Sequence, residues 1–176
     1  AQRSLGIHYN CIKAYIAGLK HAIGDVYPPF SALGLDDEQG HPIQINDHIL
    51  QLENEYYSLI RPKQIAQANE TPSAALEARG VAYVELRAAE LEPFTDVGIS
   101  SNPACLLEAL ALYCLMTPSA ALLTAEEELI ARNQTRAVDE GRLAGLKIET
   151  AAGEQHYSKW MTHNLAAMLP YAQLLD

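Results

Sequence analysis

Carboxylate, cationic and tyrosine side chains gather in two segments that alternate between apolar and polar residues. The first segment, residues 43–63, ends in IRPK and so carries Arg61 and Lys63, and the second, residues 81–94, carries Glu85 and Arg87. Because side chains alternate along a strand, Glu85 and Arg87 share one face, opposite Val84. A solvated sheet face needs only residues such as Thr, Lys or Ser, so this concentration predicts a polar site on a rigid sheet.

The residue types leave two interpretations open for Glu85 and Arg87. A carboxylate is a ligand that Mg²⁺ prefers, and the planar guanidinium of an arginine grips phosphate. Alternatively, these side chains belong to a cross-strand salt bridge on an exposed sheet.

The first segment leaves similar alternatives open. Glu53, Glu55 and Tyr57 share a face and either ligate a metal or recognise a substrate, or they form a solvated edge rich in acid. Arg61 and Lys63, held apart by a rigid proline, either neutralise a nucleotide phosphate or belong to an exposed loop.

Composition limits the classes of partner. The 176 residues fit one domain, and 22 acidic against 12 basic residues give a formal charge of −10. This balance argues against unaided binding to nucleic acid or an anionic membrane, which both require clustered cations. The longest apolar stretch, residues 104–116, is too short to span a bilayer. The chain opens at Ala1 without an initiator methionine, which indicates a piece of something longer.

The three cysteines, Cys11, Cys105 and Cys114, are odd in number and lack C-x-x-C spacing. We expect buried free thiols in a reducing cytoplasm. The histidines show no H-E-x-x-H pattern, and the chain has no P-loop, G-x-G-x-x-G or G-x-S-x-G motif. Zinc catalysis therefore has no support, and any nucleotide must be held by another kind of fold.

Apolar spacing and end signals predict five helices. Thr71 is the predicted N-cap of the second helix, Pro72 its first residue and Gly80 its stop. The residues from Thr124 to Glu127 have the form of a capping box at the start of the fourth. The predicted helices cover residues 10–23, 72–79, 102–116, 124–140 and 158–169, and residues 25–42 are a predicted loop.

These elements predict an α+β fold with a mostly antiparallel sheet and helices packed on one side. Neither strand segment shows the continuous apolar run of a buried parallel strand. We expect a single partial catalytic domain over residues 1–176, with a sheet-forming part at about 40–100 and a helical part at about 102–176.

Longer motifs resemble one known family, the bacterial glutamate–cysteine ligases. Residues 50–63 (LQLENEYYSLIRPK) are similar to the family's ENE-x-Y-x-x-IRPK segment, and TPSAAL at 71–76 leads into GVAYVELR at 80–87. The opening LGI at 5–7, YIAGLK at 15–20, PF at 93–94, GI at 98–99, and N-x-x-R with EGR-x-x-GL at 133–146 are also similar. The similarity covers about residues 4–148 and looks like the middle-to-late portion of the family.

The resemblance implies an ATP-dependent ligase that joins the γ-carboxylate of L-glutamate to the amine of L-cysteine through an acyl phosphate, the first step of glutathione synthesis. It implies a glutamine synthetase-like fold, Mg²⁺ or Mn²⁺ as cofactor, and a cytoplasmic location. Glu85 looks like a metal ligand, and Arg87 like the catalytic cation that contacts the transferred phosphoryl group of ATP. Tyr57 looks like a cysteine-pocket residue, with Arg61 and Lys63 as substrate-binding residues.

Family members are considerably longer, so we expect the other metal-binding carboxylates in a missing N-terminal portion, which is then a partner of this chain. The leading hypothesis is a part of the ligase that is inactive alone. The alternative is a non-catalytic binding or scaffold module that kept a ligase-like core.

Overall fold

The computed structural model describes residues 5–175, which form two compact units that divide between Ala89 and Glu90. Each unit combines helices with one two-stranded antiparallel sheet. The chain is therefore α+β with small antiparallel sheets, as predicted at that level. The prediction of one partial catalytic domain stays a prediction.

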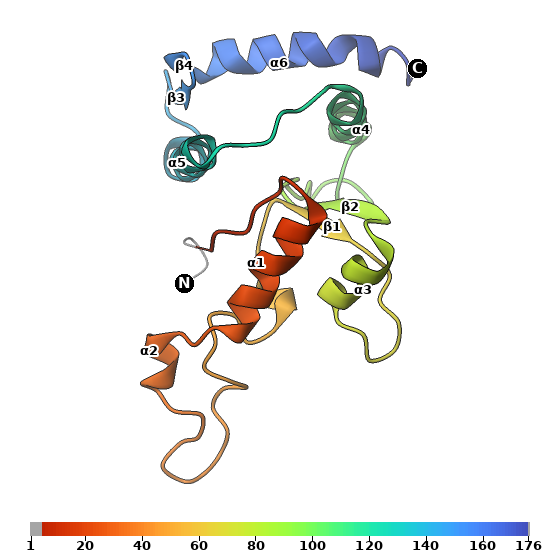
Figure 1. Ribbon diagram of the computed structural model, residues 1–176. Helices are drawn as coiled ribbons and strands as arrows, with labels where there is room; N and C mark the ends of the chain where they lie inside the picture. The colour runs from red at the N-terminus through yellow and green to blue at the C-terminus, as the bar shows by residue number, and fades with distance from the viewer. Residues whose placement is uncertain (1–4, 176) are drawn as a thin grey trace. The chain divides into compact units, whose positions relative to one another are not determined.

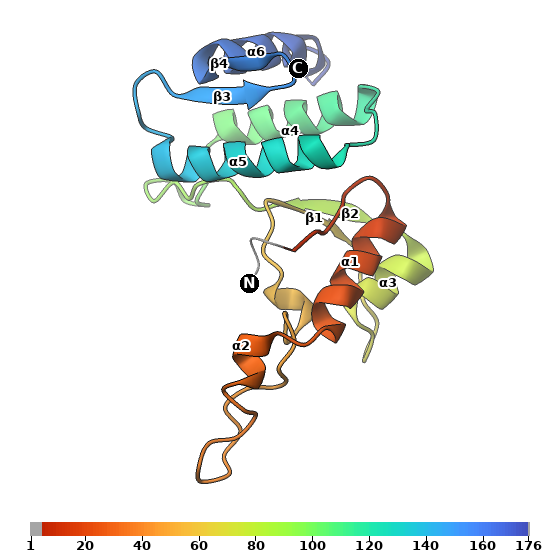
Figure 2. The ribbon, with the colours of Figure 1, turned by 60° about the vertical axis from the view of Figure 1, so that its left-hand side comes forward.

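The first unit contains three α-helices, one 3-10 helix and one hairpin. The helices are α1 (Ile12–Gly24), α2 (Pro28–Ser31) and α3 (Pro72–Arg79), and the 3-10 helix is η2 (Glu53–Glu55). The strands β1 (Ile60–Lys63) and β2 (Tyr83–Leu86) pair antiparallel and are named the β1–β2 hairpin, although the connection between them contains α3 and is not a tight turn. Figures 1 and 2 show α1 and α3 side by side, on the same side of this hairpin.

The core of the first unit forms where α1 and α3 meet. Helix α1 buries Tyr15, Ile16 and Leu19, and Leu76 of α3 packs into the same cluster with Leu50. Gly18 allows the chain at residue 7 to lie against α1, because a Cβ there would be 3.1 Å from the Cα of Ile7. The helix and its core thus hold both the segment before α1 and the segment before β1.

The ends of α3 follow the sequence prediction. Thr71 is the N-cap and its Oγ1 accepts from the N–H of Ala74 at 3.2 Å, with Pro72 at the first helical position. Gly80 has a φ of 73°, in the left-handed region that glycine adopts without strain. This stop leads the chain directly into β2.

The predicted strand segments are longer than the strands observed. Only Ile60–Lys63 of residues 43–63 and Tyr83–Leu86 of residues 81–94 are strand. Side-chain hydrogen bonds replace strand pairing in the first segment: Gln51 Oε1 accepts from Ile45 N at 2.8 Å, and Asn46 Oδ1 accepts from His48 N at 3.0 Å. Apolar alternation alone could not distinguish this turn-rich path from a strand. The predicted loop at 25–42 likewise contains the short helix α2.

The second unit contains α4 (Ser101–Met116), α5 (Thr124–Glu140) and α6 (Tyr157–Ala172), with a hairpin of β3 (Lys147–Thr150) and β4 (Gly153–His156). Helix α4 packs against α6, where the rings of Tyr113 and Tyr171 lie 5.6 Å apart. Figure 2 shows the hairpin directly before α6. The three helices agree with prediction to within a few residues at each end, whereas the hairpin was not predicted.

The motif N-x-x-R at 133–136 anchors this hairpin to α5. The Asn133 amide donates to the carbonyl of Glu149 at 2.8 Å and accepts from the N–H of Glu149 at 2.9 Å, as a neighbouring strand would. Arg136 donates to the carbonyl of Lys147 at 3.1 Å. The motif that resembles the ligase family therefore has a structural task in this unit.

All three cysteines are free, but none is buried. The expectation of buried thiols was therefore wrong. The apolar residues of α4 are not confined to one face of the helix, so their pattern does not identify an inward face. Within α4 only Ala109 is buried, and Cys105 and Cys114 are exposed.

Candidate functional site

The β1–β2 hairpin buries its charged face more deeply than its apolar face. Arg61 pairs with Glu85 in the register, so their side chains leave the same face of the sheet. Arg61 is 5% exposed, whereas Val84 on the opposite face is 56% exposed and Ile60 is 47% exposed. This burial is the reverse of an ordinary solvated sheet and marks the charged face as the candidate site.

Glu85 has one ionic neighbour on this face. Its Oε2 lies 3.8 Å from Lys63 Nζ, too far for a hydrogen bond, and this oxygen is buried without a hydrogen-bond partner among the described residues. Lys63 lies on β1 and Glu85 on β2, so Glu85 does take part in a cross-strand ion pair, as one of the two interpretations anticipated. A buried carboxylate oxygen with a free lone pair is open to a further donor or a metal ion.

Arg87 and Tyr57 come together at the end of the hairpin. The guanidinium carbon of Arg87 lies 5.3 Å from the centre of the Tyr57 ring, and Tyr57 is 62% exposed. The N–H of Arg87 donates to the carbonyl of Leu59 at 2.8 Å, which fixes the backbone beneath both side chains. A cation stacked on an aromatic face at this distance is an attractive contact that orients both groups.

Arg61 lies inside the unit rather than on its surface. Burial raises the pKa of the Tyr15 hydroxyl and neighbouring Tyr9 raises it further, while the charge of Arg61 and its hydrogen bond to Tyr15 act in the opposite direction. The guanidinium of Arg61 therefore lies beside the Tyr15 hydroxyl. Its Nε is buried and has no hydrogen-bond partner in the described part of the chain.

Glu53 has a task that neither interpretation of the sequence anticipated. Its Oε2 accepts from the N–H of Ser73 at 2.8 Å and its Oε1 accepts from the Ser73 hydroxyl, at the start of α3. Glu55 instead accepts from the N–H of Gln51 at 2.8 Å. The expectation that Glu53 and Glu55 ligate a metal together or line a solvated edge was therefore wrong for Glu53, which is buried. No local signal reveals its partner, which lies 20 residues away.

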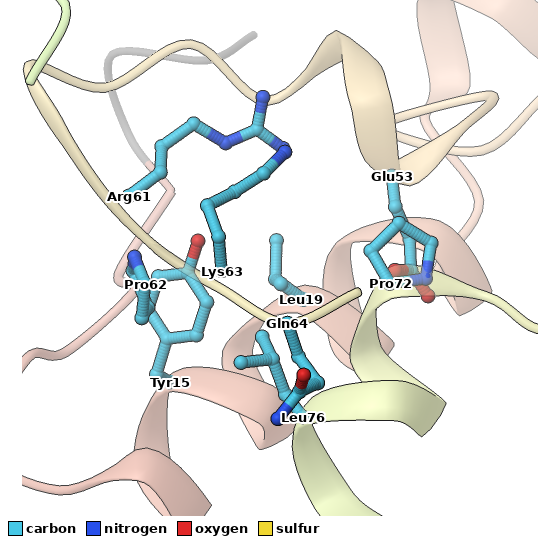
Figure 3. A pocket seen from close by; sticks show the side chains of 9 residues that line it. All are labelled: Tyr15, Leu19, Glu53, Arg61, Pro62, Lys63, Gln64, Pro72 and Leu76. Carbon is cyan, nitrogen blue, oxygen red and sulfur yellow. The ribbon is translucent and has the colours of Figure 1, made fainter. Parts of the chain in front are cut away.

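Figure 3 shows a small pocket under β1, with the side chains of Arg61 and Lys63 extending to the same side of the strand. Its cavity volume is about 10 Å³, room for no more than about one water molecule. Among residues 5–175, no group of three or more His, Cys, Asp or Glu side chains could hold a metal ion. The described residues therefore do not by themselves bring three such side chains around Glu85. The lining residues are Tyr15, Leu19, Glu53, Arg61, Pro62, Lys63, Gln64, Pro72 and Leu76.

A short charged hairpin that brings a carboxylate, a lysine and an arginine to one place is typical of a site for anionic substrates. The family model described as glutamate-cysteine ligase matches residues 1–137 of the chain. The chain belongs to the glutamate–cysteine ligase family.

Relatives and one solved structure agree with this assignment. The glutamate–cysteine ligase of Pseudomonas savastanoi pv. phaseolicola is 38% identical over 176 residues, which is 100% of this chain and 33% of that protein. The ligase of Shewanella oneidensis is 38% identical over 175 residues, covering 99% of this chain and 33% of the relative. A crystal structure of the Francisella tularensis glutamate–cysteine ligase in complex with AMP has a TM-score of 0.92 at 36% identity, over 98% of this chain and 35% of that chain.

The chain therefore spans about a third of the length of these relatives. Within the described residues, no helix is both long enough and apolar enough to cross a membrane.

Proposed function

We propose that this chain forms part of the active-site wall of an ATP-dependent glutamate–cysteine ligase. The complete ligase, meaning this chain together with the portion that its relatives have beyond it, joins the γ-carboxylate of L-glutamate to the amine of L-cysteine. The observation that carries the proposal is Oε2 of Glu85, which lies near Lys63 and is buried without a hydrogen-bond partner among the described residues, on a hairpin whose residues resemble the family's motif. The reaction itself is inferred from the membership of the chain in the glutamate–cysteine ligase family.

The chemistry explains why cations and a carboxylate belong together here. A carboxylate is a poor acceptor for an amine, so a γ-carboxylate oxygen first attacks the terminal phosphorus of ATP, and ADP leaves. The cysteine nitrogen then attacks the carbonyl carbon of the acyl phosphate, and inorganic phosphate leaves as the amide forms. Both steps build negative charge on phosphoryl oxygens, which positioned cations stabilise.

Each site residue has a role consistent with its position. Arg87, exposed and oriented by the Tyr57 ring, contacts the phosphoryl group during transfer. Tyr57 lines the cysteine pocket, and Lys63 binds an anionic part of a substrate. Arg61 belongs to the same set of substrate-binding residues, although its 5% exposure requires the substrate to approach deep into the hairpin.

Glu85 is the proposed metal ligand. Its orphaned buried oxygen fits an Mg²⁺ or Mn²⁺ ion, since these hard cations prefer carboxylate oxygens. When bound, the ion neutralises charge on the ATP phosphates. The remaining ligands belong to the portion outside this chain, which is also its proposed partner. The fold of the whole is glutamine synthetase-like, and its location is the cytoplasm.

The direct test is turnover by the isolated chain. Supplied with ATP, Mg²⁺, glutamate and cysteine, it should release no phosphate above a control without protein, because one carboxylate cannot hold the metal by itself. Phosphate release at ordinary ligase rates would contradict the proposal of a partial site. Should the complete ligase also be inactive, the chain is a non-catalytic scaffold that kept the ligase core.

A further inference from the structure

The most deeply buried carboxylate in the hairpin region is Glu53, not Glu85. Glu53 is 7% exposed and its partner Ser73 is 3% exposed. Ser73 is the second residue of α3, so its N–H is one of those left free at a helix start. A negative charge is favourable at that end of a helix. Glu53 therefore fastens the start of α3 from a distant part of the chain.

The contact closes a loop of chain around the candidate site. Glu53 is the first residue of η2, and the chain then runs through Tyr57 into β1, which contains Lys63. From Ser73 the chain runs through α3 to β2, and just before β2 the N–H of Ala82 donates to the carbonyl of Lys63 at 2.9 Å. The two ends of this loop are held by the hairpin and by the Glu53–Ser73 contact. Movement of either end would displace Tyr57 and Lys63.

The surroundings of Glu53 exclude it as an open ligand. Both of its carboxylate oxygens already accept hydrogen bonds from Ser73. A buried charge needs compensation, and Arg61, the only buried cation in the described part of the chain, lines the same pocket (Figure 3). Glu53 is thus a buried structural residue whose carboxylate oxygens are both occupied by hydrogen bonds.

We propose that Glu53 is a positioning residue of the ligase site: its contact with Ser73 holds the segment that presents Tyr57 and Lys63. This inference rests on the proposed function for its kinetic consequence, but its structural part stands on the contact alone. Glu53 touches no substrate and acts through the segment that follows it.

Hydrogen exchange on this chain tests the structural part. Glu53→Gln and Ser73→Ala alter the same contact from opposite ends, so both should speed exchange of the amides of residues 56–63, apart from Pro62, which has no amide hydrogen. Glu77→Gln is the matched control, because Glu77 lies on α3 but is exposed and pairs with Lys20. Exchange at residues 56–63 that matches the control in either variant would overturn the proposal.

Kinetics of the complete ligase test the functional part. Glu53→Gln and Ser73→Ala should each raise KM for cysteine by about ten-fold, because small misplacements of binding groups are costly, and both should leave the Mg²⁺ dependence unchanged. An unchanged KM for cysteine, or an altered Mg²⁺ dependence in Glu53→Gln alone, would contradict a positioning role. If the unaltered complete ligase forms no γ-glutamylcysteine, the proposed function fails, while the exchange measurement still decides the structural role of Glu53.

Discussion

Single residues on the charged face of the hairpin differ sharply in how they are held. Arg87 and Tyr57 are exposed and orient each other, whereas Arg61 is buried beside Tyr15. Glu85 lies between these extremes, with one oxygen that is buried and has no hydrogen-bond partner in the described part of the chain. The side chains of the candidate site therefore range from exposed, at Arg87 and Tyr57, to fully buried, at Arg61.

Substitution of Glu85 tests the metal role at this scale. Glu85→Gln keeps the shape of the side chain but removes its charge, so the complete ligase should lose activity by on the order of 100-fold or more. The measurement is γ-glutamylcysteine formation against Mg²⁺ concentration. Glu154→Gln, an exposed glutamate of β4, is the control and should keep full activity. Unchanged turnover in Glu85→Gln would exclude the metal role.

Glu70 carries a pH dependence that follows from its partners. Hydrogen bonds from Arg79, and then from the N–H of Gln67, lower the pKa of Glu70 below its usual 4.5. A lowered folded-state pKa means that the contact stabilises the unit fully above the unfolded value and is lost as the pH falls through the folded value. The amide of Gln67 should therefore become less protected against hydrogen exchange when the pH is lowered below about 4.5. Glu70→Gln should remove this dependence, and a persisting one would contradict the assignment.

At the scale of elements, local signals predicted helices better than strands. Thr71, Pro72 and Gly80 mark α3 because caps and stops act within a few residues. The bounds of α5 match the prediction, but its capping box begins one residue earlier than expected, because the N-cap is Leu123, whose N–H donates to Glu126 Oε2 at 2.8 Å. The prediction of long strands was wrong. In the first segment, side-chain hydrogen bonds of Asn46 and Gln51 determine the path of the chain in place of strand pairing.

The site itself was predictable only in part. Residue types and spacing identified the charged face with Glu85 and Arg87, and the approach of Tyr57 to Arg87 follows from hairpin pairing. The buried contact between Glu53 and Ser73 joins residues that are distant in sequence, and hydrophobic periodicity gives no signal for it. The strands of the β3–β4 hairpin are too short for periodicity to reveal them.

The β3–β4 hairpin tests the anchoring role of Asn133. Asn133→Ala removes two hydrogen bonds to the backbone of Glu149, which are worth about 0.5–1.5 kcal/mol each. The amide of Glu149 should therefore exchange faster with solvent hydrogen. Asn102→Ala, at an exposed position of α4, is the control. Equal exchange of Glu149 in both variants would show that the hairpin docks without Asn133.

At the scale of the whole molecule, the chain spans about a third of the length of its ligase relatives, and Oε2 of Glu85 in the candidate site is buried without a hydrogen-bond partner among the described residues. The apolar face of the β1–β2 hairpin is exposed at Ile60 and Val84, and a two-stranded sheet is marginal by itself. Both features agree with a site that is completed by the portion outside this chain.

Reconstitution of the ligase from two parts tests most directly whether the β1–β2 hairpin forms part of the active site. The chain is mixed with the separately produced remaining portion of the ligase, and ATP-dependent formation of γ-glutamylcysteine is followed. The account predicts product only when both parts are present, and none when the chain carries Glu85→Gln. Product from the remaining portion alone, or undiminished product with Glu85→Gln, would contradict the claim that this hairpin forms part of the active site.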